Sequence, residues 1–252
     1  MAVVAPTASL LEDSTFELLL RLGDSALILG HRVSEWCGHG PVLEEDIALA
    51  NTALDLIGQA TLWLEYAAEV EGKGRTADDL AYLRDAHGFR NLLICERPNG
   101  DFGQTMMRQF LYDAWSLPML KALMDHADPR IGEIAAKASK EVTYHLERSS
   151  DLCLRLADGT EESHRRMQAA LDDLWAFTGE MFTGDAVDAS IVEGLRAPWM
   201  ETVRQLETIG TLTMPESDFS HLGGKTGRHS EHLGYLLAEM QFLQRAYPGA
   251  SW

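Results

Sequence analysis

Cysteine is scarce in this chain of 252 residues, and the three that occur lie far apart. Cys37, Cys95 and Cys153 are odd in number, and none belongs to a Cys-x-x-Cys pair. This pattern excludes a zinc knuckle and a disulfide framework. We expect all three to be small residues of the hydrophobic core.

Basic residues are also few. The chain has 21 Lys and Arg against 39 Asp and Glu, which gives a net charge of −18. Nucleic acids and anionic membranes bind basic surfaces, so the charge argues against both as partners. A local basic cluster can still hold an anionic ligand against this acidic background.

Long apolar runs are missing too, because none approaches the ~18 residues that a membrane-spanning helix needs. The first ten residues place no basic residue before their apolar stretch, which is unlike a signal peptide. The sequence therefore predicts a cytoplasmic protein. Residues 1–13 are expected to form a flexible tail, and residues 14–252 a single domain.

What the sequence does have is helical periodicity, with no convincing run of alternating apolar residues. Ser14 and Glu17 have the form of a capping box, which predicts a first helix from there to about Cys37. Pro41 begins a second helix that ends at Gly72. All-α is the predicted fold class.

The predicted second helix is apolar nearly all round. One stripe follows helical spacing, and the opposite faces are apolar as well, so we expect this helix inside a bundle. The stripe comprises Ile47, Ala50, Leu54, Ile57 and Leu64, and the other faces carry Leu49, Ala53, Leu56, Ala60 and Trp63.

Capping residues mark the later helices. Thr76, Asp101, Asp128 and Thr160 each stand where a helix is predicted to begin. The long helices among these run over 101–125, 128–158 and 160–182, and shorter ones follow at 188–195, 199–210 and 230–246. The helices predicted before Gly72 form one hairpin, and those over 101–125 and 128–158 form a second. A long connection joins the two hairpins. That arrangement is the ferritin-like plan, here with extra C-terminal helices.

A ferritin-like bundle that binds two metal ions supplies two Glu-x-x-His motifs and two further Glu residues. Glu161-x-x-His164 is the one literal match, but it lies at a helix start beside Arg165 and Arg166. Asp218-x-x-His221 falls in a predicted loop. We interpret both as surface residues rather than as ligands.

Polar residues in the predicted interior are more informative. Asn51, Asp55 and Gln59 form an i, i+4, i+8 line on the second helix, where a metal-binding helix would carry Glu-x-x-His. We predict a hydrogen-bonded polar core at a lost metal site, with Arg108 and Lys140 as further partners. The core residues are Asp55, Gln59, Gln109, Asp113, Glu141, Tyr144 and His145.

Two alternatives remain open on the sequence. Asp113, Glu141 and His145 could hold one metal ion and make the chain an independent oxidase or oxygenase. The chain could instead be a helical binding module unrelated to oxygenases. No Gly-x-Ser-x-Gly elbow occurs, and no glycine-rich phosphate loop follows a strand.

Several segments resemble the structural, ferritin-like subunits of phenylacetyl-CoA epoxidases, which are multicomponent monooxygenases. The resemblance runs in register over about residues 14–252 and does not depend on one short motif. The segments that carry it are SEWCGHGP (34–41), LEEDIALANTALDLIGQA (43–60), ERPNGDFGQTMMRQFLYDAW (96–115), KEVTYHLERS (140–149) and GGKTGRHSEHLGYLLAEMQFLQR (223–245).

The resemblance implies a protein without catalytic activity, which pairs with a homologous catalytic subunit holding a di-iron centre. That complex epoxidises the ring of phenylacetyl-CoA, in aerobic phenylacetate degradation. Its electrons come from NADPH through a reductase with flavin and iron–sulfur groups. This chain is expected to bind no metal or cofactor of its own.

The glycine-rich segment 223–229 is cationic in an otherwise acidic chain. Glycines allow close backbone approach, and free amides near a helix start attract anions. Coenzyme A carries several phosphates, so Lys225, Arg228 and His229 are candidates to hold an acyl-CoA at the subunit boundary. The alternative is that these cations pair with acidic groups of the protein itself.

Overall fold

The structure is a computed structural model that describes residues 8–250. It is all-α, and no strand occurs within that range. The helices are α1 Ala8–Ser34, α2 Leu43–Glu71, α3 Ala77–Tyr82, α4 Phe102–Leu123, α5 Pro129–Ala157, α6 Glu161–Trp175, α7 Ala189–Val192, α8 Arg196–Val203, α9 Gln205–Thr208, α10 Glu231–Met240 and α11 Phe242–Ala246. Short 3-10 turns lie at Ala86–Gly88, Leu93–Glu96 (η2), Gly179–Phe182 and Gly224–Thr226.

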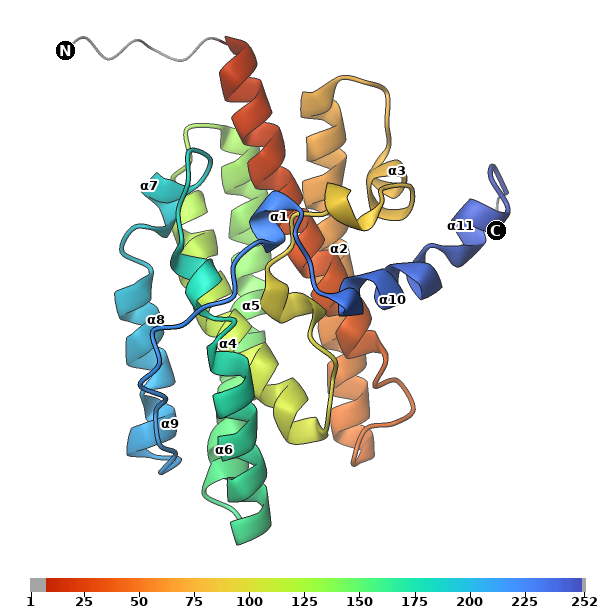
Figure 1. The fold of residues 1–252 in the computed structure, drawn as a ribbon. Helices are drawn as coiled ribbons and strands as arrows, with labels where there is room; N and C mark the ends of the chain where they lie inside the picture. Colours follow the sequence, from red (N-terminus) through yellow and green to blue (C-terminus); the bar gives the residue numbers. More distant parts are fainter. Residues whose placement is uncertain (1–7, 251–252) are drawn as a thin grey trace, which may run out of the picture.

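Two long antiparallel hairpins form the body of the molecule, as the sequence predicted. α1 packs along α2, α4 packs along α5, and α2 meets α5 across the bundle (Figure 1). α6 and α8 cover the outer side of α4. α10 and α11 project away from the bundle (Figure 1). This is the ferritin-like arrangement with added C-terminal helices.

The predicted caps of the later helices are confirmed. The Asp101 side chain accepts a hydrogen bond from the Gln104 amide at 2.9 Å, and Asp128 accepts from the Arg130 amide at 2.9 Å. Thr76 and Thr160 each form a capping box. Short polar side chains at these positions satisfy amides that the first helical turn leaves free.

The predicted capping box at Ser14 is wrong. α1 already begins at Ala8, upstream of the predicted cap, so residues 8–13 belong to the helix. Glu17 does not reach back to cap the helix, because its carboxylate accepts from Arg90 Nε at 2.9 Å. Residues 1–7 of the predicted tail lie outside the described residues.

The prediction that α2 is buried on every side is also wrong. Its packing face contains Leu49, Ala53, Leu56, Ala60 and Trp63, all of them buried. The opposite face is open: Leu43, Ile47 and Leu54 are 71, 53 and 67% exposed. By length and composition α2 could also cross a membrane, although the sequence pattern had predicted no such helix. Burial of one face against α1 gives a packing reason for much of its apolar character.

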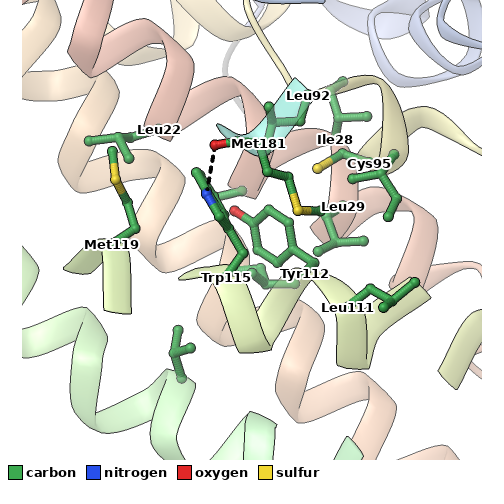
Figure 2. Packing of buried hydrophobic residues seen from close by; sticks show 14 of the residues in the cluster. Leu22, Ile28, Leu29, Leu92, Cys95, Leu111, Tyr112, Trp115, Met119 and Met181 are labelled. Atoms are coloured by element: carbon green, nitrogen blue, oxygen red, sulfur yellow. Dashed lines mark hydrogen bonds between the residues drawn. The ribbon is translucent and has the colours of Figure 1, made fainter. Parts of the chain in front are cut away.

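α4 is the centre of the hydrophobic core. Tyr112 and Trp115 lie among Leu22, Ile28, Leu29, Leu92 and Met181 in Figure 2. The indole nitrogen of Trp115 donates to the carbonyl of Met181 at 3.0 Å, and that of Trp199 donates to the carbonyl of Leu111 at 3.0 Å. These bonds satisfy the polar ends of large buried rings, and they fix the C-terminal segments on α4.

The three cysteines are free, and two of them behave as predicted. Cys95 and Cys153 are buried in the core, and burial raises the pKa of both thiols. Cys37 is exposed in the turn after α1, so its predicted core position is wrong.

Candidate functional site

The interior of the bundle contains a polar cluster centred on Asp113. Gln109, one turn earlier on α4, donates to one carboxylate oxygen at 2.7 Å, and Ser149 on α5 donates to the other at 2.9 Å. Asp113 is fully buried. Burial raises its pKa to about 6, although the charge of His145 and these two hydrogen bonds act in the opposite direction.

Two further pairs join α2 to α5 beside this cluster. Gln59 donates to the Glu141 carboxylate at 2.9 Å, and His145 Nε2 lies 2.9 Å from the Asp55 carboxylate. Gln59 and His145 are buried, whereas Asp55 and Glu141 are half-buried. The predicted pairing of these inward residues is therefore present, but it extends to the edge of the bundle.

The cluster is not fully satisfied. Gln109 Oε1 and His145 Nδ1 are buried, and neither finds a hydrogen-bond partner in the described part of the chain. Most buried polar atoms in proteins are paired, because an unpaired one costs about 1–3 kcal/mol. These two atoms are the part of the cluster that hydrogen bonds within the described residues leave unsatisfied.

The cluster does not fit a di-iron centre. Between residues 8 and 250 no three His, Cys, Asp or Glu side chains come together as a metal site. Asp113, Glu141 and His145, the alternative ligand set, do not form one group: Glu141 pairs with Gln59, and His145 with Asp55. Leu56, which has no donor atom, is buried on the same helix as Gln59.

Several residues predicted for the polar core lie elsewhere. Tyr144 is 57% exposed, because it sits on the outer side of α5, and Asn51 and Lys140 are exposed too. Arg108 is buried but donates to the carbonyl of Arg97 and to Asn99 Oδ1, so it supports the turn before α4 rather than the carboxylates. Burial lowers the pKa of Arg108 to about 10.

The two Glu/Asp-x-x-His matches lie at or near the surface, as interpreted from the sequence: Asp218 and His221 are exposed, and His164 is half-buried. His164 Nδ1 lies 2.8 Å from the carbonyl of Ala157, and Glu161 is exposed. His221 stacks on Phe177, with ring centroids 4.6 Å apart.

The glycine-rich segment 223–229 is held down by this chain's own acids. Lys225 is buried; its ammonium group lies 2.6 Å from Asp188 Oδ2 and donates to the carbonyl of Thr183 at 3.1 Å. Arg21 pairs with the same Asp188 at 2.9 Å. Lys225 is therefore not available to a phosphate, and its assignment to coenzyme A is wrong.

Glu180 fills the anion position that the glycines create. Its carboxylate accepts from the amides of Leu93 at 2.8 Å, Gly223 at 2.8 Å and Gly224 at 2.7 Å, and it is buried. The amides that the sequence suggested were free for a ligand are thus already used. A side chain at position 224 would place Cβ 2.2 Å from the carbonyl oxygen of Asn91, so glycine is required there.

His229 is also part of the internal network. Its Nδ1 lies 3.0 Å from the Glu96 carboxylate, and its Nε2 lies 3.0 Å from the carbonyl of Phe89. Both partners are acceptors, so both ring nitrogens are placed to donate. Of the three predicted phosphate ligands, Arg228 alone is exposed.

Sequence reasoning missed Glu96, Glu180 and Asp188, the buried acids that hold this segment. None of them belongs to a recognisable motif, and each is far in sequence from the group it binds. Lys225 and His229 thus follow the alternative stated above, in which the cations pair with acidic groups of the protein itself.

The chain matches the protein family described as "Phenylacetic acid catabolic protein" over residues 5–252. It is also similar to a protein of Escherichia coli (strain K12) that is named as one of the subunits of 1,2-phenylacetyl-CoA epoxidase. The two are 47% identical over 241 residues, which cover 92% of this chain and 97% of that relative.

Proposed function

This chain belongs to the family of phenylacetic acid catabolic proteins, and from that we propose that it is a non-catalytic, structural subunit of a phenylacetyl-CoA epoxidase. It pairs with and supports a homologous subunit that carries the di-iron centre. A reductase with flavin and iron–sulfur groups delivers electrons from NADPH to that subunit. The complex works in the cytoplasm, in aerobic phenylacetate degradation.

The observation that carries the proposal is the donor pattern inside the bundle. Where a di-iron helix bundle presents converging carboxylates and imidazoles, this chain presents separate hydrogen-bonded pairs, such as Gln59 with Glu141. Asp113 is left with neutral donors from Gln109 and Ser149. Such a cluster supports a bundle but offers no open set of ligands for iron.

The test of the non-catalytic role is the iron content of the purified chain. We expect well under one iron per chain after aerobic purification, and no gain when Asp113 is replaced by Ala. The catalytic subunit purified in the same way is the positive control. Stoichiometric iron that is lost in Glu141→Ala and His145→Ala variants would overturn the proposal and favour the independent oxygenase.

The partner surface that we propose is the outer face of α2. Leu43, Ile47 and Leu54 are exposed on it at helical spacing, which is a continuous apolar stripe rather than scattered residues. Obligate interfaces bury roughly 2,000 Å² or more and are apolar in their centre. The first hairpin therefore supplies a suitable surface for a second helical bundle.

Co-purification with the catalytic subunit tests this surface. Leu54→Lys should abolish or strongly weaken the complex while leaving the isolated chain folded, because Leu54 is exposed. Leu83→Lys is the matched control, since Leu83 is similarly exposed but follows α3. If both variants reduce the recovered complex equally, the outer face of α2 is not the interface. A stable wild-type monomer with no affinity for the catalytic subunit would refute the structural role itself.

A further inference from the structure

A groove of about 610 Å³ lies between the end of α6, the chain after η2 and the loop that precedes α10. Its lining includes Arg97, Asp173, Phe177, His221, Leu222 and Arg228. The loop runs from α9 back across the molecule before it enters α10 (Figure 1). The volume is within the roughly 300–1,000 Å³ typical of small-molecule sites.

One wall of the groove is a stack of flat groups. The guanidinium carbon of Arg97 lies 4.5 Å from the centre of the Phe177 ring. The Phe177 and His221 rings stack with centroids 4.6 Å apart and planes inclined by 21°. Phe219 meets His221 edge to face at 4.9 Å. Phe177 is half-buried between Arg97 and His221, whereas His221 is exposed at the end of the stack. An exposed flat ring of this kind provides a platform for a planar heterocycle such as a purine base.

The groove also has cations with spare hydrogen-bonding capacity. Arg97 makes one ion pair, a long one with Asp173 at 3.4 Å. Arg228 is exposed and forms no ion pair or side-chain hydrogen bond with residues 8–250. Asp173 is the one acidic residue of the lining, and it already accepts from Gln104 at 2.9 Å. Two arginines in this position favour an anion with several oxygens.

The internal network described above makes this groove rigid. The amide of His221 donates to the carbonyl of Ala176 at 2.8 Å, which fixes the aromatic wall on the end of α6. The amide of Arg228 donates to the carbonyl of Gly223 at 2.9 Å, and Glu180 holds Gly223 in turn. Arg228 is thereby presented outward from a fixed backbone, which reduces the entropy lost on binding.

We propose that this groove binds the phosphorylated adenosine portion of a nucleotide cofactor. The base packs against the exposed His221 at the end of the stack, and the phosphates meet Arg97 and Arg228. Two ligands of the proposed complex share this chemistry: an acyl-CoA, and the NADPH of the reductase. The proposal rests on the proposed function for the choice of these two ligands, but the geometry of the groove does not depend on it.

Calorimetric titration of the full-length chain with coenzyme A and with NADPH tests the groove. The variants are Arg228→Gln and Arg97→Gln, and Arg196→Gln is the matched control. Arg196 also lies over an aromatic ring, that of Phe182 at 5.5 Å, but it is outside the groove. We expect each groove variant to bind roughly tenfold more weakly, as for the loss of a charged hydrogen bond, and the difference from wild type to shrink at high salt. Adenosine without phosphate should bind far more weakly than either cofactor.

The titrations separate the two sources. Tighter binding of coenzyme A assigns the groove to the thioester substrate, and tighter binding of NADPH assigns it to the reductant; each outcome supports the groove. Failure of both cofactors to bind the wild-type chain would overturn the proposed site. An equal loss of affinity in Arg228→Gln and Arg196→Gln would overturn it as well. Co-purification of the same variants with the catalytic subunit shows independently whether the proposed function stands, because Arg97 and Arg228 lie outside the α2 face.

Discussion

Two buried acids of this molecule are held by different kinds of hydrogen-bond donor. Around Glu180, both carboxylate oxygens receive backbone amides, three in all. Around Asp113, the carboxylate receives two side-chain donors, while Gln109 Oε1 and His145 Nδ1 next to it have no partner in the described chain. The first acid holds a loop in place through backbone amides, and the second is held by side-chain donors alone.

This difference indicates in which region the stability of the protein depends more on polar contacts. Backbone amides are fixed by the fold, so a buried acid that binds them cannot be replaced by side-chain rearrangement. The Asp113 cluster is made of side chains on two helices whose packing is mostly apolar. We therefore expect substitutions around Glu180 to destabilise the protein more than substitutions around Asp113.

The largest effect is expected for Glu180→Ala. The variant leaves the amides of Leu93, Gly223 and Gly224 buried without an acceptor, which should lower the free energy of unfolding by roughly 3–5 kcal/mol. Urea unfolding measures it. Glu162→Ala is the control, because the exposed Glu162 pairs with Arg165 and Arg166 on the same helix, and its loss should leave the midpoint nearly unchanged. Similar midpoints for the two variants would erase the contrast between the regions.

The second prediction concerns the pH dependence that Asp113 creates. Its pKa in the folded protein is about 6, above the ordinary 3.8, so the folded state keeps a proton that the unfolded chain has already released. The contribution of Asp113 to the free energy of unfolding is therefore fully present below pH 3.8. It falls by roughly 3 kcal/mol as the pH rises through about 6. Asp113→Asn removes this titration.

Unfolding of the wild type and of Asp113→Asn at several pH values across that window measures the difference. We expect the free energy of unfolding of the variant to increase relative to that of the wild type as the pH rises. Asp151→Asn, at an exposed position of α5, should instead follow the wild-type profile. A constant difference between wild type and Asp113→Asn at all pH values would mean that Asp113 is ionised as easily as an exposed carboxyl group.

The smallest effect is expected for Tyr144→Phe. Tyr144 is 57% exposed, so its hydroxyl group has water as a partner and its removal should change the free energy of unfolding by less than about 0.5 kcal/mol. The measurement is the same urea titration. A loss of about 1–3 kcal/mol, as when a buried polar group loses its hydrogen-bond partner, would return Tyr144 to the polar core that the sequence had predicted for it.

Local chemistry explains which sequence predictions succeeded. The starts of α3, α4, α5 and α6 follow from Thr76, Asp101, Asp128 and Thr160, because a cap depends on residues next to one another in the chain. The same reasoning failed at Ser14, where the helix continues upstream and Glu17 is taken by Arg90, a partner distant in sequence. Local signals are thus sufficient only where no long-range partner competes for the same side chain.

The candidate sites show the same limit. Helical spacing brought Gln109 and Asp113 together, since they lie one turn apart on α4. It could not show that Tyr144, one residue before the buried His145, faces outward, because the rotation of α5 against the bundle decides that. Nor could it show that Lys225 is paired with Asp188, which belongs to a different segment.

The sequence by itself determined the helices, their hairpin order and the absence of an evident ligand set, since periodicity, caps and residue types are local properties. Only the tertiary structure decided which face of α2 is open and which acids occupy the glycine-rich segment. It also decided that Arg97, Phe177, His221 and Arg228 share one groove. Those results depend on contacts between residues far apart in the chain, and such contacts form only when the elements pack against one another.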